Sequence, residues 1–225
     1  PNCWRVWVIV RMNPSRQIVA YFDFDGTISR KDTLVPFLVF VVGKLRFTLA
    51  LPKLIPIVIR YCLGMINNEA AKQATLTVLL KGYSKRQVEH KAKQFALTHL
   101  NKYINPVAYA KIEWHREHGH NLFLVSANLG IYLRHWANLH KLDQVIATEL
   151  EIDAQQCLTG RLLTHNCYGK QKVERIQDFL TKNKLNFNYA YAYGNSAGDF
   201  EMLEYADEPY YVSGEMIEAW EGRNG

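Results

Sequence analysis

Apolar residues along the chain fall into two repeating patterns. Short runs rich in β-branched and aromatic residues predict buried strands over residues 18–22, 121–126, 144–148, 188–193 and 210–212. Apolar residues spaced three and four positions apart predict helices over residues 107–118, 130–141, 170–183 and 200–205. Strands that alternate with helices are typical of a parallel sheet with helices on both faces. The pattern therefore predicts an α/β fold with a Rossmann-like, doubly wound parallel sheet, and a hairpin formed by 150–152 and 158–162.

A different pattern separates the first predicted strand from the second. Residues 34–63 are densely apolar and contain three prolines, which predict several short helices. Residues 72–99 have a helix-favouring composition. No uninterrupted apolar run reaches the ~20 residues that a membrane-spanning helix needs. We therefore expect a helical cap over residues 30–104, inserted after the first strand into a core made of residues 17–29 and 105–225.

Residues 1–16 form an N-terminal extension whose role the sequence does not identify. The apolar stretch over residues 4–10 is too short to span a bilayer, and no small-residue cleavage site follows it. An added edge strand, an artefact and a membrane-touching arm all fit this stretch.

Charge is distributed unevenly along the chain, whose net charge is +6. Residues 30–104 contain 13 Lys or Arg against 3 Asp or Glu, so this segment carries +10 and the remainder carries −4. A basic segment beside an acidic body favours an anionic partner, such as a phosphorylated substrate, an anionic membrane surface or nucleic acid. Nucleic acid ranks lowest, because the aromatic residues of the segment follow an apolar pattern and not a basic groove.

Composition narrows the class of protein further. Apolar residues make up 48% of the chain, which excludes a disordered protein. The four cysteines are scattered and form no C-x-x-C pair, so neither a disulfide framework nor a zinc site is indicated. This usage favours a reducing compartment, and we expect a cytoplasmic protein, with peripheral membrane contact as an additional hypothesis.

Candidate chemistry lies at the end of the first predicted strand. The apolar run over 18–22 ends at Asp23 and Asp25, which Gly26 and Thr27 follow. Ligands of open α/β sheets bind at the carboxyl ends of strands, and strand alternation directs these two carboxylates the same way. Two carboxylates so close favour a hard divalent cation such as Mg²⁺, which a phosphate group could share.

The sequence DFDGT at 23–27 resembles the first motif of the haloacid dehalogenase-like (HAD) phosphohydrolases. Three further segments resemble the other motifs in the order of that family: Ser126 after the second strand, a Lys at the start of the helix that begins near residue 170, and GNSAGD at 194–199. The resemblance covers nearly all of the chain outside the expected cap. It implies a HAD core and a phosphatase activity.

The resemblance also implies roles for individual residues. Asp23 would be the nucleophile that forms an aspartyl-phosphate, and Asp25 would protonate the leaving oxygen and then activate water. The side chain of Ser126 would donate a hydrogen bond to a phosphoryl oxygen. The implied phosphate-binding set is Gly26, Thr27, Ser126, Ala127 and Asn128.

Two lysines compete for the third motif. Lys170 resembles the lysine of phosphoserine phosphatases, and Lys172 resembles that of lipid phosphatase relatives. Lys170 is slightly preferred, because it lies nearer the start of the predicted helix, where anions are favoured.

The fourth motif departs from the family pattern, since Asn195 stands where a metal-binding Asp is usual. The implied Mg²⁺ ligands are Asp23, Asp25 through its backbone carbonyl, Asn195 and Asp199. An amide oxygen is a neutral but acceptable ligand. Asp199 would either coordinate the metal or hold the catalytic Lys and a water molecule. If Asn195 abolishes metal binding, the chain is a non-catalytic relative.

Two groups of relatives suggest different substrates. The insertion after the first motif and residues 148–161 resemble phosphoserine phosphatases, and Asp32 lies where those enzymes place a substrate-binding Glu. The apolar, basic stretch over 37–63 instead resembles phosphatidylglycerophosphatase-like relatives. We expect Mg²⁺-dependent hydrolysis of a phosphomonoester, either a lipid head group or a small metabolite such as phosphoserine. The alternative is a catalytically weak basic module that binds anionic membrane or nucleic acid.

Overall fold

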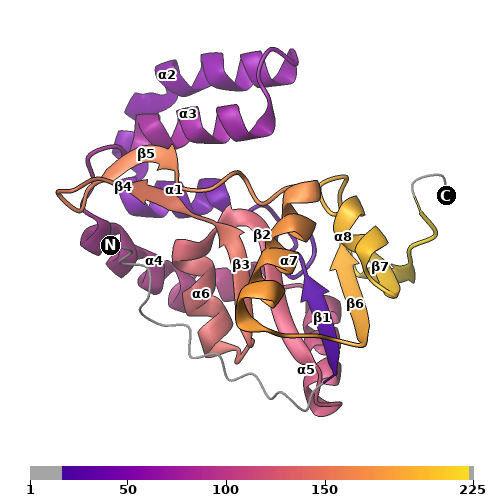
Figure 1. Cartoon of the computed structure of the whole chain (residues 1–225). Coiled ribbons are helices and arrows are strands. Elements are labelled where there is room, and N and C mark those ends of the chain that lie inside the picture. The colour runs from indigo at the N-terminus through magenta and orange to yellow at the C-terminus, as the bar shows by residue number, and fades with distance from the viewer. Residues whose placement is uncertain (1–16, 223–225) are drawn as a thin grey trace.

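A six-stranded sheet forms the centre of the computed structural model, which describes residues 17–222; the extension over 1–16 lies outside the described residues. The strand order is β3-β2-β1-β6-β7-β8 (Figure 1). The strands are β1 (Ile18–Phe22), β2 (Asn121–Leu129), β3 (Gln144–Thr148), β6 (Tyr189–Gly194), β7 (Glu208–Ser213) and β8 (Met216–Ala219). All neighbouring pairs are parallel except β7 and β8. The predicted α/β class with a parallel sheet is confirmed.

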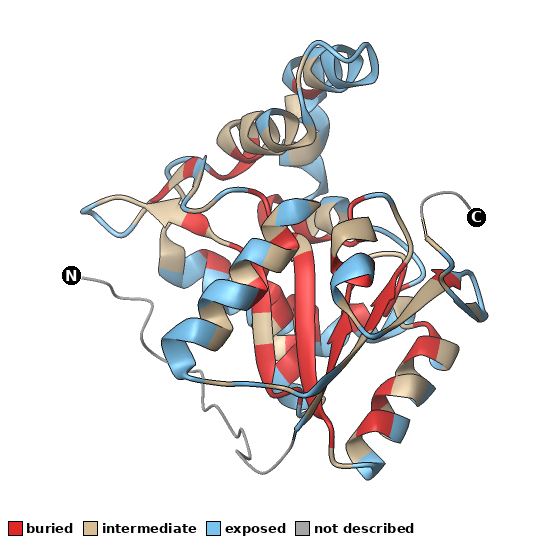
Figure 2. Ribbon diagram, turned by 45° about the vertical axis from the view of Figure 1, so that its right-hand side comes forward, coloured by how far each residue is buried: buried red, intermediate tan, exposed pale blue. Residues whose placement is uncertain are grey.

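Strand β1 lies in the middle of the sheet and is buried on both faces. Ala20 and Phe22 belong to one hydrophobic cluster, and Val19 and Tyr21 belong to another. Helices α5 (Pro106–Glu117) and α6 (Gly130–Leu139) pack into the first cluster, and α7 (Lys170–Asn183) and α8 (Phe200–Tyr205) pack into the second. Figure 2 shows the resulting buried sheet between two layers of helices.

The segment between β1 and α5 is helical. It comprises α1 (Leu34–Val42), α2 (Lys44–Cys62), α3 (Asn68–Leu80), α4 (Lys85–Thr98) and the short 3₁₀ helix η1 (Leu100–Tyr103). Helix α4 packs against α6, and α3 packs against β5 (Leu158–Leu162), which pairs with β4 (Leu150–Ile152). Gly160 permits this approach, because a Cβ atom there would lie 2.5 Å from the Cα of Thr77. The division into a cap at 30–104 and a core stays a prediction.

The prolines of this segment do not divide it as predicted. Helix α2 is 19 residues long and contains both Pro52 and Pro56. A proline removes a backbone donor from the helix. Because both prolines are exposed, water can replace the bonds that are lost. Pro36 lies in the first turn of α1, where the backbone N–H would have no partner within the helix.

The carboxyl-terminal end of the sheet also differs from prediction. The expected strand at 210–212 lies within β7, and the sequence pattern missed β8 entirely. Strand β8 is mostly exposed, with Ile217 half-buried, so its apolar signal is weak. Among residues 17–222 no helix is both long and apolar enough to cross a membrane.

Candidate active site

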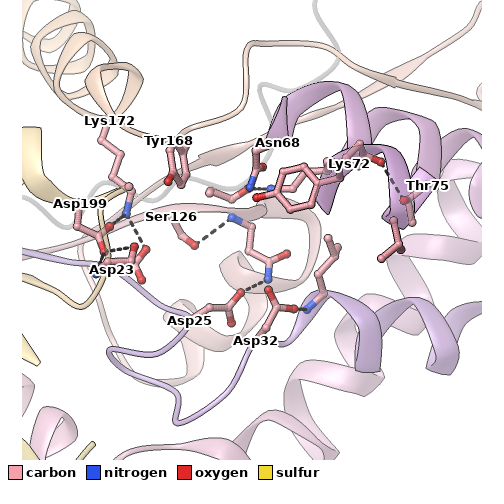
Figure 3. A pocket seen from close by; sticks show the side chains of 18 of the residues that line it. Asp23, Asp25, Asp32, Asn68, Lys72, Thr75, Ser126, Tyr168, Lys172 and Asp199 are labelled. Atoms are coloured by element: carbon pink, nitrogen blue, oxygen red, sulfur yellow. Dashed lines mark hydrogen bonds and ion pairs between the residues drawn. The ribbon is translucent and has the colours of Figure 1, made fainter. Parts of the chain in front are cut away.

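A pocket of about 320 Å³ lies at the carboxyl ends of β1 and β6 and beside β2 (Figure 3). The edge at which parallel strands end is the usual ligand site of an open α/β sheet. Side chains of the core and of the inserted helices face each other across it. The polar residues of its lining are Asp23, Asp25, Asp32, Asn68, Lys72, Thr75, Ser126, Asn128, Tyr168, Lys172, Ser196 and Asp199.

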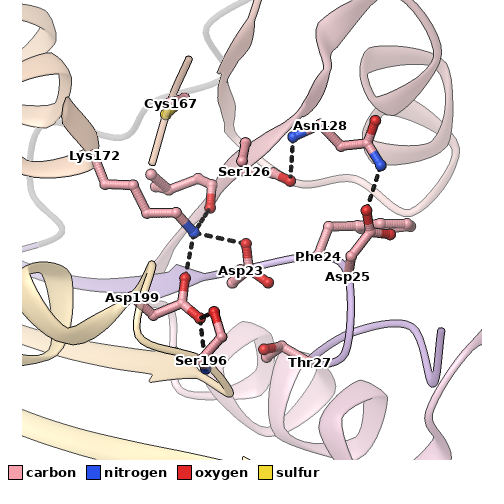
Figure 4. A network of polar contacts seen from close by, with 12 residues as sticks. Asp23, Phe24, Asp25, Thr27, Ser126, Asn128, Cys167, Lys172, Ser196 and Asp199 are labelled. Atoms are coloured by element: carbon pink, nitrogen blue, oxygen red, sulfur yellow. Dashed lines mark hydrogen bonds and ion pairs between the residues drawn. The ribbon is translucent and has the colours of Figure 1, made fainter. Parts of the chain in front are cut away.

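Lys172 is a buried cation between two carboxylates (Figure 4). Its Nζ donates hydrogen bonds to Oδ1 of Asp23 and Oδ1 of Asp199, both at 2.6 Å, and to the carbonyl of Val125 at 2.8 Å. Burial alone would lower the pKa of Lys172, but the two carboxylates outweigh burial and raise it. The ammonium group is therefore charged at neutral pH.

Lys170 lies outside this cluster, which corrects the slight preference for it. Its side chain is 79% exposed and forms a surface ion pair with Glu174 at 3.7 Å. Although Lys170 is the first residue of α7, its side chain faces solvent. Lys172 instead lies one turn before the buried Ile176, on the face of α7 that packs on the sheet. This spacing is the sequence signal that distinguishes the two lysines.

Asp23 follows β1, and hydrogen bonds hold both its backbone and its side chain. Its backbone N–H donates to the carbonyl of Tyr193 at 2.9 Å, and its carboxylate accepts from Lys172. Burial and the neighbouring charge of Asp199 raise the pKa of Asp23 to about 7, and Lys172 opposes this rise. The side chain is 9% exposed and lines the pocket. Asp23 is therefore a buried carboxylate whose charge depends on its cationic neighbour.

Asp25 is held by a separate set of donors. Its Oδ1 accepts hydrogen bonds from Thr33 Oγ1 at 2.7 Å and from the Thr33 backbone N–H at 3.0 Å, and its Oδ2 accepts from Asn128 Nδ2. Burial and the charge of Asp32 raise the pKa of Asp25 to about 7, while the bonds from Thr33 and Asn128 oppose the rise. A carboxyl group with such a pKa exchanges a proton readily near neutral pH.

The end of β2 lines the pocket. The pairing of β2 with β3 shifts register between Ser126 and Leu129, as at a β-bulge. Ser126 lines the pocket, and its Oγ accepts from the backbone N–H of Asn128 at 3.1 Å. Ala127 and Asn128 also line the pocket, and the Asn128 side chain holds Asp25. The positioning of Asp25 by Asn128 and Thr33 is a relation that the sequence did not reveal.

Gly26 and Thr27 both lie against Asn195. A Cβ atom at residue 26 would lie 2.1 Å from Asn195 Nδ2, and Gly26 has a φ of +84°, so a glycine is needed there. The Thr27 hydroxyl donates to Asn195 Oδ1 at 3.2 Å. Gly26 and Thr27 are not among the residues that line the pocket. Within the structure they position Asn195, and their predicted contact with phosphate stays a prediction.

The oxygen atoms near Asp23 fit a hard cation in part. Both carboxylate oxygens of Asp199 already accept hydrogen bonds. Its Oδ2 accepts from Ser196 Oγ at 2.9 Å and from two backbone N–H groups, and its Oδ1 accepts from Lys172. No group of three or more His, Cys, Asp and Glu side chains within residues 17–222 is placed to hold a metal. The donors compatible with Mg²⁺ are the Asp23 carboxylate, the Asp25 carbonyl and Asn195 Oδ1. Asp199 thus fits the second of its two predicted roles, holding the lysine.

Helix α3 contributes a second cation that sequence reasoning missed. Lys72 Nζ donates to the carbonyl of Ala127 at 2.7 Å and to Asn166 Oδ1 at 2.8 Å. Burial lowers the pKa of Lys72 to about 8. Asn166 is also held by α3, since its N–H donates to Glu69 Oε2 at 2.7 Å and its Nδ2 donates to Asn68 Oδ1 at 2.8 Å. These four bonds join the inserted helices to the core beside the pocket.

Comparison with known proteins identifies the family. The family model of haloacid dehalogenase-like hydrolases matches residues 20–204. The chain belongs to this family. Protein CicA of Caulobacter vibrioides is 30% identical over 194 residues, which cover 86% of this chain and 85% of CicA. The haloacid dehalogenase-like assignment made from the four motifs is therefore confirmed.

Two solved structures share the fold of this chain. A protein of unknown function from Bordetella pertussis Tohama I aligns with a TM-score of 0.74 at 22% identity, over 87% of this chain and 89% of that one. A phosphoserine phosphatase with an analogue of its phospho-aspartyl intermediate aligns with a TM-score of 0.57 at 20% identity, over 86% of this chain and 85% of that one. The likeness extends through the inserted helices, because each alignment covers most of the chain.

Proposed function

We propose that this protein is a Mg²⁺-dependent phosphomonoester hydrolase that acts through an aspartyl-phosphate on Asp23. The observation that carries the proposal is the contact of the buried ammonium of Lys172 with Asp23, inside a pocket that Asp25 and Ser126 also line. Two carboxylates with different partners in one pocket suit a nucleophile and a proton donor. The phospho-aspartyl analogue bound to the phosphoserine phosphatase is consistent with this chemistry.

In the first half-reaction a carboxylate oxygen of Asp23 attacks phosphorus, and the bond between phosphorus and the ester oxygen breaks. Asp25 gives its proton to the leaving oxygen, which departs as an alcohol. The raised pKa of Asp25, about 7, keeps a protonated fraction available near neutral pH. Lys172 favours the ionised form of Asp23 and offers positive charge to the phosphoryl group, and the Ser126 hydroxyl donates to a phosphoryl oxygen.

In the second half-reaction water attacks phosphorus and the bond to Asp23 breaks. Asp25, now ionised, accepts a proton from that water, so phosphate leaves and both carboxyl groups return to their starting states. Thr33 and Asn128 hold Asp25 in one orientation through both steps. Bound Mg²⁺ would supply neutralising charge for the phosphoryl group, with Asp23, the Asp25 carbonyl and Asn195 as its protein ligands.

The substrate class stays open between a small phosphorylated metabolite and a lipid phosphate. Lys72 and Asp32 face the pocket from the inserted segment, and both would contact the part of the substrate beyond its phosphate. The apolar side chains of Ile57, Val58 and Tyr61 form another wall. A cytoplasmic location, with or without membrane contact, also stays a prediction. A weakly catalytic binding module is the alternative, and it predicts salt-sensitive binding of anions without release of phosphate.

The test is release of phosphate from an aryl phosphate by the wild type and Asp23→Asn, each with Mg²⁺ and with a chelator. We expect Mg²⁺-dependent turnover by the wild type and its loss in Asp23→Asn. Asp178→Asn, the same change at an exposed position of α7, is the matched control and should leave turnover intact. Acid quenching during turnover should trap phosphate on the wild-type protein. Full activity of Asp23→Asn would exclude the mechanism.

A further inference from the structure

Helix α2 carries large apolar side chains on its outward side. All of α2 is described, and Leu54 is its buried residue. Leu45 is 75% exposed, Leu49 71% and Ile59 51%, and Leu63 just after the helix is 70% exposed. At 3.6 residues per turn, positions 45, 49, 59 and 63 all point to one side of the helix, so these four side chains form an apolar stripe made of two pairs, 45 with 49 and 59 with 63. Figure 1 shows α2 as the outermost helix, beyond α3 as seen from the sheet.

The inward side of α2 is apolar as well, and it is the side that packs. Phe47, Ala50, Leu54 and Ile57 contact the hydrophobic core. A side of a helix that carries several large apolar residues is normally covered. In Figure 2 the outer helices are largely pale blue and tan, in contrast to the red sheet, so the outward stripe has no cover within the described chain.

Basic residues border this stripe. Arg46, Lys53 and Arg60 are seven positions apart and therefore lie on one side of α2, next to the outward apolar residues. All three are exposed. The sequence from residue 33 to residue 68 contains no Asp or Glu and four Lys or Arg, so its net charge is +4. An apolar face with basic residues beside it is the composition of a helix that lies in the plane of a membrane surface.

We propose that the outward face of α2 docks on an anionic lipid bilayer. This face, called the docking face, consists of Leu45, Leu49, Ile55, Ile59 and Leu63 with Arg46, Lys53 and Arg60. Lipid explains both properties, because acyl chains accept the apolar residues and anionic head groups accept the basic ones. A second copy of the chain fits less well, since two such faces would bring like charges together.

Helix α2 carries both the docking face and one wall of the pocket of Asp23. Ile57, Val58 and Tyr61, on the inward side of the same helix, line that pocket. A docked protein would therefore hold the pocket close to the lipid head groups. The substrate class that this arrangement favours is a phosphomonoester anchored in the bilayer; this last step rests on the proposed phosphatase function, whereas docking itself does not.

The experiment is cosedimentation of the full chain with vesicles of phosphatidylcholine alone and with roughly 30% phosphatidylglycerol, an anionic lipid. We expect binding to the anionic vesicles that weakens with salt. Ile55→Glu with Ile59→Glu should abolish it, and Leu139→Glu with Leu163→Glu, at equally exposed positions elsewhere, should not. Lys53→Gln with Arg60→Gln should weaken binding about fivefold per charge removed. Lys102→Gln with Lys182→Gln removes the same charge from other exposed sites and should have a smaller effect.

Several results would overturn the docking face: no binding of the wild type to anionic vesicles, equal loss in the α2 variants and their controls, or self-association that the α2 substitutions abolish. Hydrolysis of the soluble aryl phosphate separates the two proposals. Turnover without vesicle binding would remove the docking face and leave the phosphatase. Vesicle binding without turnover would keep the docking face and remove the phosphatase.

Discussion

Replacing Lys172 with Met removes the buried cation and retains an unbranched apolar side chain. Asp23 and Asp199, each 2.6 Å from Nζ, would then remain buried without their common partner. Removing one member of a buried ion pair typically costs about 3–5 kcal/mol. We expect the free energy of unfolding of Lys172→Met, measured with urea at pH 7 without metal, to fall by at least about 3 kcal/mol.

The pH dependence identifies the origin of this loss. Without Lys172 the pKa of Asp23 must rise further above its value of about 7, because the one group that lowers it is absent. A carboxyl group whose pKa is higher in the folded than in the unfolded protein destabilises the fold when ionised, and protonation relieves the penalty. The deficit of Lys172→Met should therefore shrink as the pH falls from 7 to 5. Adding Asp199→Asn should also recover part of the stability at pH 7, since it removes one of the two buried charges.

Lys170→Met is the matched control, two residues away on the same helix. Its exposed ion pair with Glu174 should contribute less than about 0.5 kcal/mol. In the aryl phosphate assay we expect Lys172→Met to lose about 10²–10³-fold in turnover, the usual effect of removing one charge-stabilising donor, and Lys170→Met to stay within about twofold. Normal turnover by a folded Lys172→Met, or loss of turnover by Lys170→Met, would refute the assignment.

Three further predictions concern single side chains. Burial lowers the pKa of Lys72 to about 8, so its charge is lost above that pH and the KM for an anionic substrate should rise there. Lys72→Met should raise KM about tenfold already at pH 7 and remove this pH dependence of KM, which steady-state kinetics would measure. Asn195→Asp adds a carboxylate where a neutral amide now stands, and should tighten Mg²⁺ binding in calorimetry; an unchanged affinity would exclude Asn195 as a ligand. Burial lowers the pKa of His115 from 6.5 to about 3, so between these two pH values the folded protein binds fewer protons than the unfolded one. The free energy of unfolding should therefore decrease by about 1.4 kcal/mol for each unit by which the pH is lowered in this window. His115→Gln should flatten that slope in urea titrations, and equal slopes would count against the buried neutral histidine.

Local signals predicted the sheet and its chemical edge well. The strand at 18–22 is buried on both faces, so an unbroken apolar run identifies it, and Asp23 and Asp25 follow it directly in sequence. Helix α7 was predicted with its observed bounds, 170–183, from its apolar spacing. The same spacing places Lys172 with Ile176, but the argument from the helix start gave more weight to Lys170. The spacing to Ile176, which indicates that Lys172 is buried, was a better guide than the position of Lys170 at the start of the helix.

Contacts between distant segments could not be predicted from one sequence. Lys72 reaches Ala127 and Asn166, which are far from it in sequence, and its own neighbourhood resembles any solvated helix. The hold of Thr33 and Asn128 on Asp25 likewise depends on how the inserted helices sit on the sheet. The prolines of α2 were misleading for a related reason: whether a proline ends a helix depends on whether water reaches the freed carbonyls, which is a property of the packed structure.

The four hydrogen bonds that tie α3 to Ala127 and Asn166 affect how ligands could enter and leave the pocket. They stand beside the pocket, so any opening wide enough to exchange ligands by moving α3 away from the core must break them together. Lys72 donates two of these bonds and also lines the pocket. The side chain that ties α3 to the core is therefore one that an anionic substrate would meet. An anionic ligand that binds Lys72 would therefore compete with the Ala127 carbonyl and Asn166 Oδ1 for the same ammonium group.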